Sequence, residues 1–262
     1  MSPTRIPIYQ VDAFASRVFT GNPAAVCPLE KWLPDEQMQA IAAENNLAET
    51  AFFVPNGEGY HLRWFTPAVE VDLCGHATLA SAFVIMNKLT PAAKSVQFLT
   101  KSGKLVVTRD GDLLSLDFPA RPAVECEVHP GLTAALGGRP EKVLAARDYL
   151  VVYATEAELR SLTPDMDGLR KTDCFAVIAT APGRDVDFLS RFFAPAQGIP
   201  EDPVTGSSHC TLIPYWSARL GKKKLHAYQA SPRGGELWCE DRGERVTISG
   251  KAVQFLEGSI SL

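Results

Sequence analysis

The chain has 262 residues, 46% of them hydrophobic, which is enough to bury a substantial core in one large domain or two smaller ones. Its 26 lysines and arginines against 30 acidic residues give a net charge of -4, with no long run of one sign. This balance argues against a nucleic-acid surface or a polybasic membrane patch and favours a small-molecule partner. The N-terminus lacks a secretory signal and no apolar run approaches ~18 residues, so we expect a cytoplasmic protein that does not enter membranes.

The first half of the chain predicts strands followed by helices in a recurring order. Strand candidates lie at 6–14, 24–28, 50–54 and 60–65, with an amphipathic helix at 35–45. A second helix should begin at Gly75, because Leu79, Phe83 and Met86 follow it at spacings of three or four. Further strand candidates come after this helix, at 96–100, 104–109 and 113–118.

The second half repeats this order. Strand candidates at 148–154 and 174–180 precede an apolar helix that should begin at Gly206, and strand candidates at 225–229, 236–240 and 245–249 follow it. Pro214 lies inside the expected helix and should kink it or shift its start, because proline lacks a backbone donor.

A short motif is also repeated before each of these two helices. Residues 65–68 (FTPA) precede an acidic loop and then Cys-Gly-His at 74–76, while residues 193–196 (FAPA) precede an acidic loop and then Thr-Gly-Ser at 205–207. Such a repeat predicts an α+β fold of two pseudo-symmetric halves, each a curled, mostly antiparallel sheet around a central helix. We expect the halves to be residues 1–118 and 119–262, with a cleft between them.

The two glycine-led helix starts are candidate binding elements. Unpaired backbone N–H groups and the positive ends of two helix dipoles suit a substrate carboxylate or a developing enolate. The alternative is that Gly75 and Gly206 only permit a tight turn into each helix.

Three polar residues near these elements are candidates for acid–base or binding roles. Glu49 stands beside a strongly apolar strand, a setting that favours proton transfer, although a solvated strand-entry residue would look the same. Asp202 precedes the second helix and would be read as a helix cap if it stood alone. His76 follows Gly75 and is placed to donate to a substrate oxygen, or to make a structural hydrogen bond. His209, deeper in the second helix, is assigned a structural role.

Cys74 presents a competing chemistry. A thiol at a helix start can ionise and act as a base, but its counterpart in the repeat is Thr205, which cannot, and Cys74 also fits a small buried residue. The sequence has no metal-binding spacing of histidines or cysteines and no Gly-x-Gly-x-x-Gly or Walker loop. We therefore expect neither a metal nor an organic cofactor.

Four segments taken together resemble the PhzF-like family of phenazine biosynthesis, in order and over essentially the whole chain. They are residues 21–26 (GNPAAV), 46–52 (NLAETAF), 65–79, which include CGHATL, and 201–207 (EDPVTGS). The resemblance implies a diaminopimelate-epimerase-like fold, a homodimer, no cofactor and an isomerase that moves a proton on a small carboxylate-bearing substrate. The best-understood members isomerise a dihydro-hydroxyanthranilate.

The resemblance also implies roles for individual residues. Glu49 matches the general acid/base of the family, and the substrate-binding positions fall on His76, Asp202, Ser207, Gly75, Gly206 and Asn22. Ala48 stands where serine is common and Ser208 where alanine is common, departures that bear on specificity more than on chemistry. Two alternatives stay open, a thiol-dependent epimerase or racemase and a non-catalytic small-molecule-binding protein on the same scaffold.

Overall fold

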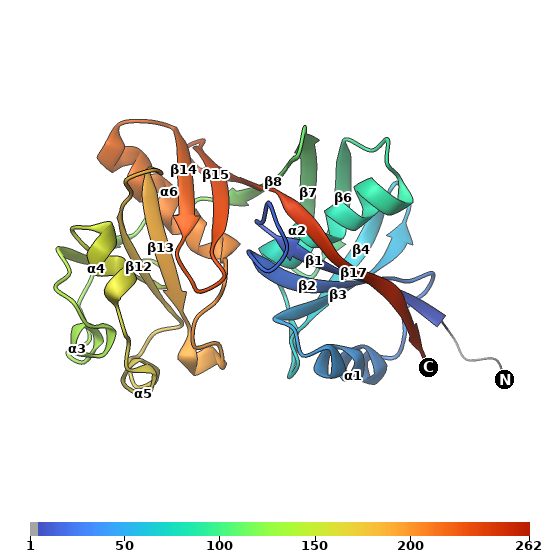
Figure 1. The fold of residues 1–262 in the computed structure, drawn as a ribbon, viewed down its shortest axis with the longest axis horizontal. Coiled ribbons are helices and arrows are strands. Elements are labelled where there is room, and N and C mark those ends of the chain that lie inside the picture. The colour runs from blue at the N-terminus through green and yellow to red at the C-terminus, as the bar shows by residue number, and fades with distance from the viewer. Residues whose placement is uncertain (1–4) are drawn as a thin grey trace. The chain divides into compact units, whose positions relative to one another are not determined.

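The computed structural model describes residues 5–262, which form two compact units (Figure 1). The first unit reaches Asp117 and also contains Ser249–Leu262, and the second is Phe118–Ile248. Both consist of mostly antiparallel strands with a few helices, so the expected α+β class is confirmed. In the described part of the chain, no helix is long and apolar enough to cross a membrane.

The first unit is built around one apolar helix. Its elements are β1 (Arg5–Ala13), β2 (Asn22–Pro28), α1 (Asp35–Asn45), β3 (Glu49–Asn56), β4 (Gly59–Phe65), β5 (Glu70–Val71), α2 (Gly75–Val84), the π-helical turn η1 (Ile85–Leu89), β6 (Ser95–Thr100), β7 (Gly103–Asp110), β8 (Leu113–Pro119) and β17 (Ala252–Ser261). In β6 every second residue is buried, as the period of a half-buried strand requires. Helix α2 is buried along nearly all of its length and packs against β1, β2 and β3. Its first turn is therefore held firmly against the strand ends.

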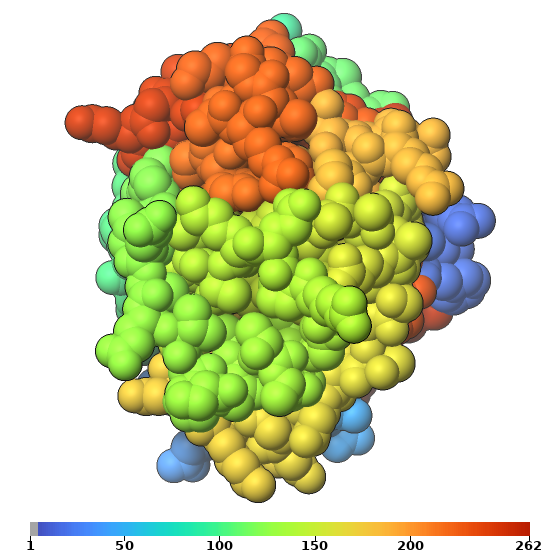
Figure 2. All heavy atoms as spheres, turned by 90° about the vertical axis from the view of Figure 1, so that its left-hand side faces the viewer, coloured from blue at the N-terminus to red at the C-terminus, as the bar shows by residue number. Residues whose placement is uncertain are grey.

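The second unit contains the same kinds of element with more short helices. They are β9 (Val124–Glu125), α3 (Leu132–Leu136), β10 (Lys142–Ala145), β11 (Tyr149–Val152), α4 (Glu156–Ser161), α5 (Met166–Arg170), β12 (Val177–Pro182), β13 (Phe188–Phe193), the 3-10 turn η2 (Pro195–Gln197), α6 (Gly206–Leu220), β14 (Lys224–Gln229), β15 (Gly235–Asp241) and β16 (Arg245–Gly250). Helix α6 packs against β14 and β15. Figure 2 shows the face of this unit on which the segments around α3, α4 and α5, in green to yellow, are exposed. Strands β10 and β13 and these three short helices were not predicted from the sequence.

One order of strand pairing occurs in both units. In the first, β1–β2 is antiparallel, β2–β3 parallel, β3–β4 antiparallel, β4–β6 parallel and β6–β7 antiparallel. In the second, β10–β11, β11–β12, β12–β13, β13–β14 and β14–β15 follow the same alternation. Each parallel pair needs a crossover connection, and a helix lies in each one. The predicted pseudo-symmetric halves are thus confirmed.

The last strand of the chain differs from the division expected at residue 118. Strand β17 pairs antiparallel with β1 from Arg5 opposite Ser261 to Ala13 opposite Ala252. Residues 249–262 therefore belong to the first unit, whereas the sequence-based division assigned them to the second half. Pairing between the two ends of a chain uses backbone groups that every residue carries, so no local sequence pattern predicts it.

Pro214 lies inside α6 without displacing the start of the helix from Gly206. Because proline has no N–H, the carbonyl of Cys210, four residues earlier, lacks its helical donor. The backbone N–H of Arg121 donates to that carbonyl instead, at 2.8 Å. A segment distant in sequence therefore compensates for the proline, and the expected shift of the helix start does not occur.

Candidate active site

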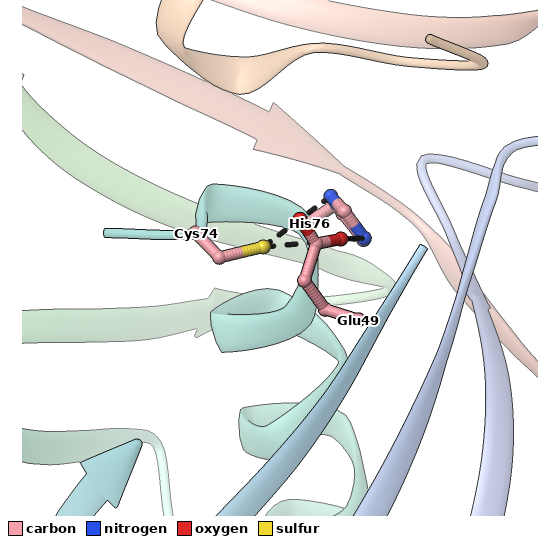
Figure 3. A group of neighbouring side chains, drawn as sticks. All are labelled: Glu49, Cys74 and His76. Atoms are coloured by element: carbon pink, nitrogen blue, oxygen red, sulfur yellow. Dashed lines mark hydrogen bonds and ion pairs between the residues drawn. The ribbon is translucent and has the colours of Figure 1, made fainter. Parts of the chain in front are cut away.

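The first group of predicted site residues gathers where β3 begins and α2 begins. Glu49 is the first residue of β3 and lies opposite Ala24 of the parallel strand β2. Cys74 is the N-cap of α2, and His76 lies in its first turn, directly after Gly75. Figure 3 shows the side chains of Glu49, Cys74 and His76 converging at this helix start.

The His76 ring has neighbours at both of its nitrogens. Its Nε2 lies 2.9 Å from Oε2 of Glu49, and its Nδ1 lies 3.2 Å from the amide Nδ2 of Asn22, the first residue of β2. The Sγ of Cys74 lies 3.5 Å from Nδ1 and 4.0 Å from Nε2. Asn22, Cys74 and His76 are buried, while the Glu49 side chain keeps 13% exposure. The structure thus places Asn22 against His76, and Glu49 is the member of the group that solvent reaches most.

Burial and charge set the protonation of this group. Burial alone would lower the pKa of His76, but Cys74 and the Glu49 carboxylate, both in contact with the ring, raise that pKa well above its usual range. Burial, reinforced by the charge of Glu49, raises the pKa of the Cys74 thiol to about 11. The thiol is therefore protonated at neutral pH, and the neighbours of His76 favour the protonated form of its ring. The thiolate expected for a reactive cysteine is absent from this state.

The same three side chains form a possible metal-ligand set. One ligand atom each from Glu49, Cys74 and His76 lies within 4.8 Å of the others. No spacing motif in the sequence indicated this set, because its members come from a strand and a helix start brought together only by folding. The absence of a metal-binding spacing in the sequence therefore did not exclude a ligand set in the fold, and the expectation of metal-independent activity stays a prediction.

The second group lies at the start of α6, in the second unit. Thr205 is the N-cap residue of α6, and its hydroxyl donates a short hydrogen bond to Oδ2 of Asp202. The backbone N–H of Thr205 donates to Oε1 of Gln229 at 2.8 Å. In turn, Nε2 of Gln229 donates to the carbonyl of Asp202 at 2.9 Å and contacts the Thr205 hydroxyl at 3.1 Å. Gln229 is fully buried, so it fixes the conformation of the loop that carries Asp202.

Ser207 is the second residue of α6, directly after Gly206, and its hydroxyl contacts Arg147, which is itself bound to Asp148. Nη2 of Arg147 lies 3.4 Å from the Ser207 hydroxyl and 2.7 Å from Oδ2 of the buried Asp148. The Nε of Arg147 also donates to Asp148, at 2.9 Å, which makes the ion pair bidentate. The guanidinium is further packed over the Phe175 ring, 4.5 Å from its centroid. A guanidinium held in place by Asp148, which balances its charge, therefore lies beside the predicted substrate-binding serine.

Sequence reasoning missed Gln229 and Arg147. For Gln229 a signal existed: Leu225, Ala227 and Gln229 occupy the inward phase of β14, and a glutamine at an inward position needs a specific polar partner. For Arg147, an arginine followed by an aspartate gave no indication that the pair would be partly buried beside Ser207.

His209 makes hydrogen bonds of a structural kind. It is fully buried in α6, and its Nδ1 lies 2.8 Å from the carbonyl of Thr205, the residue four positions earlier. Burial lowers the pKa of His209 to about 4, so the ring is neutral at physiological pH.

With the fold and both groups described, comparison with known proteins identifies the family. The family model of phenazine biosynthesis-like proteins, PhzC-PhzF, matches residues 11–258, so the chain belongs to this family. An uncharacterized isomerase of Pseudomonas aeruginosa is 53% identical over 257 residues, covering 98% of this chain and 99% of its own. A PhzF-family crystal structure from Enterococcus faecalis superposes with a TM-score of 0.97 at 49% identity, covering 99% of this chain and 100% of that one. The enzyme class is that of an isomerase.

More distant structures share the fold alone. A hydroxyproline epimerase from Agrobacterium vitis, solved with trans-4-hydroxy-L-proline bound, has a TM-score of 0.62 at 10% identity, covering 98% of this chain and 93% of that one. The epimerase-like architecture of the two units is thus supported by structure as well as by sequence. At this identity the likeness says nothing about which side chains react.

Proposed function

We propose that this protein is a cofactor-independent isomerase that moves a proton on a small carboxylate-bearing substrate, with Glu49 as general acid/base. The observation that carries the proposal is the contact of 2.9 Å between Oε2 of Glu49 and Nε2 of His76 at the start of α2. A carboxylate with residual exposure can reach a substrate proton, and the buried imidazole beside it fixes its orientation. Positioned acid–base groups of this kind typically contribute about 10²–10⁴-fold to the rate.

The chemistry divides into two proton transfers. In the first, Glu49 removes a proton from a substrate carbon, which leaves the electron pair delocalised toward a carboxylate or conjugated group. In the second, the protonated carboxyl of Glu49 returns a proton to a different carbon, so the substrate is isomerised without net oxidation or reduction. One residue is sufficient because it alternates between base and acid.

The start of α2 offers stabilisation for the anionic intermediate. The neighbours of His76 favour its cationic form, because they raise its pKa well above its usual range, and the first N–H groups of the helix, from Gly75 onward, have no helical partner of their own. A cation, oriented N–H groups and the helix dipole all favour a developing oxyanion, and they are in position before the reaction begins. Asn22 lies beside the other nitrogen of His76, where a half-turn of its amide would let the oxygen accept from the protonated ring.

The family pattern also implies substrate-binding residues at the start of α6. Asp202 and Ser207, with the N–H groups after Gly206, are proposed to hold the polar groups of the substrate. The bidentate pair of Arg147 with Asp148 supports this assignment, because it holds a hydrogen-bond donor, the Arg147 guanidinium, beside Ser207.

Thiol-dependent epimerisation is the competing function. Cys74 lies at the correct helix start and contacts His76, but the high pKa of its thiol and the threonine at position 205 leave the site without a pair of reactive thiols. A non-catalytic binding protein would need no acid beside an imidazole.

Solvent-deuterium exchange tests the proposal. The protein is incubated in heavy water with dihydro-hydroxyanthranilate and with a panel of small unsaturated or α-amino carboxylates, and incorporation of deuterium is followed by mass spectrometry. We expect incorporation with at least one carboxylate and its loss in Glu49→Gln. Incorporation that survives Glu49→Gln but is abolished by Cys74→Ala would assign the reaction to the thiol.

Three further statements stay predictions: the homodimer, the cytoplasmic location and a part in phenazine biosynthesis. Light scattering of the purified protein tests the first. Fractionation of the producing cells tests the second, and the metabolites lost on deletion of the gene test the third.

A further inference from the structure

Glu49, Cys74 and His76 present three different ligand types to one point. The atoms concerned are a carboxylate oxygen, a thiol sulfur and an imidazole nitrogen, and all of them lie within 4.8 Å of one another. Nε2 of His76 lies 2.9 Å from Glu49 Oε2 and 4.0 Å from Cys74 Sγ, while Nδ1 lies 3.5 Å from the same sulfur. Three protein ligands with one open position are the usual arrangement of a zinc ion that can still exchange its fourth ligand.

These separations are close to what a tetrahedral ion requires. With bonds of about 2.3 Å to sulfur and 2.0–2.2 Å to nitrogen and oxygen, ligand atoms around Zn²⁺ lie roughly 3.3–3.6 Å apart. Nitrogen and oxygen would therefore separate by a few tenths of an ångström, and sulfur and nitrogen would approach by a similar amount. The sulfur and the carboxylate oxygen lie within 4.8 Å of each other, so the side chains of Cys74 and Glu49 would also have to rotate toward one another.

The residue that contacts the other ring nitrogen of His76 is also suited to a metal site. A histidine that binds zinc usually donates its other ring N–H to an oxygen, which fixes the ring. Asn22 lies 3.2 Å from Nδ1 of His76, and a half-turn of its amide would present an oxygen to that position. The Glu49 side chain as a whole keeps 13% exposure, although its Oε2 is itself buried.

We propose that Glu49, Cys74 and His76 bind a thiophilic divalent cation such as Zn²⁺, and that the bound ion stops proton transfer. The ion would take the lone pairs of Glu49 that accept the substrate proton, and it would displace the protons of the thiol and the imidazole into solvent. Binding involves no oxidation or reduction. The inhibition of proton transfer rests on the proposed function, because a bound ion blocks the reaction in this way only if Glu49 is the general acid/base.

Cadmium provides a probe of binding that does not depend on activity. The full chain is treated with a chelator, dialysed and titrated with Cd²⁺, and the ultraviolet band of a cadmium–thiolate bond is recorded. We expect saturation near one equivalent in the wild type and loss of the band in Cys74→Ser. The matched control is Cys174→Ser, which removes a partly exposed thiol in the second unit and should leave the band unchanged.

Exchange measurements then test the consequence. Added Zn²⁺ should stop deuterium incorporation by the wild type, a chelator should restore it, and the inhibitory concentration should rise at least about 10-fold in Cys74→Ser, measured against that variant without metal. A band that persists in Cys74→Ser, or is lost in Cys174→Ser, overturns the metal site. Saturation by Cd²⁺ with undiminished exchange overturns the inhibition. If Glu49→Gln retains exchange, the proposed function fails while the metal site still stands on its thiolate band.

Discussion

Oε2 of Glu49 lies 2.9 Å from Nε2 of His76, although one residue begins strand β3 and the other lies in the first turn of helix α2. The acid keeps some exposure to solvent while the imidazole is buried behind it. A carboxylate in this setting is held in one orientation by a partner whose protonated form carries the opposite charge. Most of the following predictions test what this pair and its neighbours do.

Replacement of Glu49 by glutamine should abolish most of the activity. The amide keeps the shape and the polarity of the side chain but cannot accept a proton, so turnover and deuterium incorporation should fall by roughly 10²-fold or more, while substrate binding survives. Exchange in heavy water and calorimetric binding measure the two effects. Glu44→Gln, the same change at an exposed position of α1, is the matched control and should retain full exchange. An equal loss in both variants would contradict the assignment.

Removal of the Cys74 thiol should be tolerated far better. Cys74→Ala deletes a buried group whose thiol is protonated at neutral pH, so it should cost some stability or affinity and leave proton exchange measurable. The rate of exchange and the midpoint of thermal unfolding follow the two effects separately. A loss of exchange as large as that of Glu49→Gln would favour the thiol mechanism.

Chelation should leave the enzyme active. The proposed transfers use a carboxyl group, a charged imidazole and backbone N–H groups, none of which needs a metal, so activity should be unchanged after treatment with EDTA and dialysis. Turnover before and after the treatment provides the measurement. Activity that is lost and then restored by a divalent metal would show a dependence that the mechanism does not include.

Gln229→Leu should destabilise the protein and weaken substrate binding together. Leucine keeps the size of the side chain but leaves the buried N–H of Thr205 and the carbonyl of Asp202 without their partner, at a cost of roughly 1–3 kcal/mol for each such group. The free energy of unfolding in urea and the KM give the two readouts. Gln97→Leu, at an exposed position of the corresponding strand β6, should change stability by less than about 0.5 kcal/mol. If the two substitutions change the free energy of unfolding equally, Gln229 does not fix the loop that carries Asp202.

Stability should fall in acid partly because of His209. Its pKa is about 4 in the folded state and 6.5 when exposed, so the unfolded chain takes up this proton first as the pH falls. The contribution is complete above pH 6.5 and is lost as the pH drops toward 4, at a total cost of roughly 3 kcal/mol. His76, whose folded pKa is raised, acts in the opposite direction, and its contribution is lost as the pH rises above 6.5.

The substitution His209→Asn isolates this effect. Asparagine can still donate to the Thr205 carbonyl but does not titrate, so the variant should lose less stability than the wild type between pH 6.5 and pH 4. Urea unfolding at a series of pH values measures the difference. Parallel pH profiles for the two proteins would contradict the assignment.

The sequence by itself determined the repeat and the two helices at its centre. Apolar residues three or four apart predicted helices beginning at Gly75 and Gly206, and α2 and α6 begin there. The helix at 35–45 and many of the strands that precede and follow the two central helices were also predicted, because the period of a helix or a half-buried strand is a local property of the chain. Four motifs in order were specific enough to indicate the family.

Only the tertiary structure decided how these pieces meet. The placement of β17 beside β1, the contact of His76 with Glu49 and Asn22, and the bonds of Gln229 to the loop of Asp202 all join segments that are far apart in the chain. Such contacts depend on the pairing of strands and on the packing of a helix against them, and backbone hydrogen bonds that any residue can make leave no pattern in the sequence. The protonation of Cys74 and His76 was decided in the same way, because burial and a neighbouring charge exist only after folding.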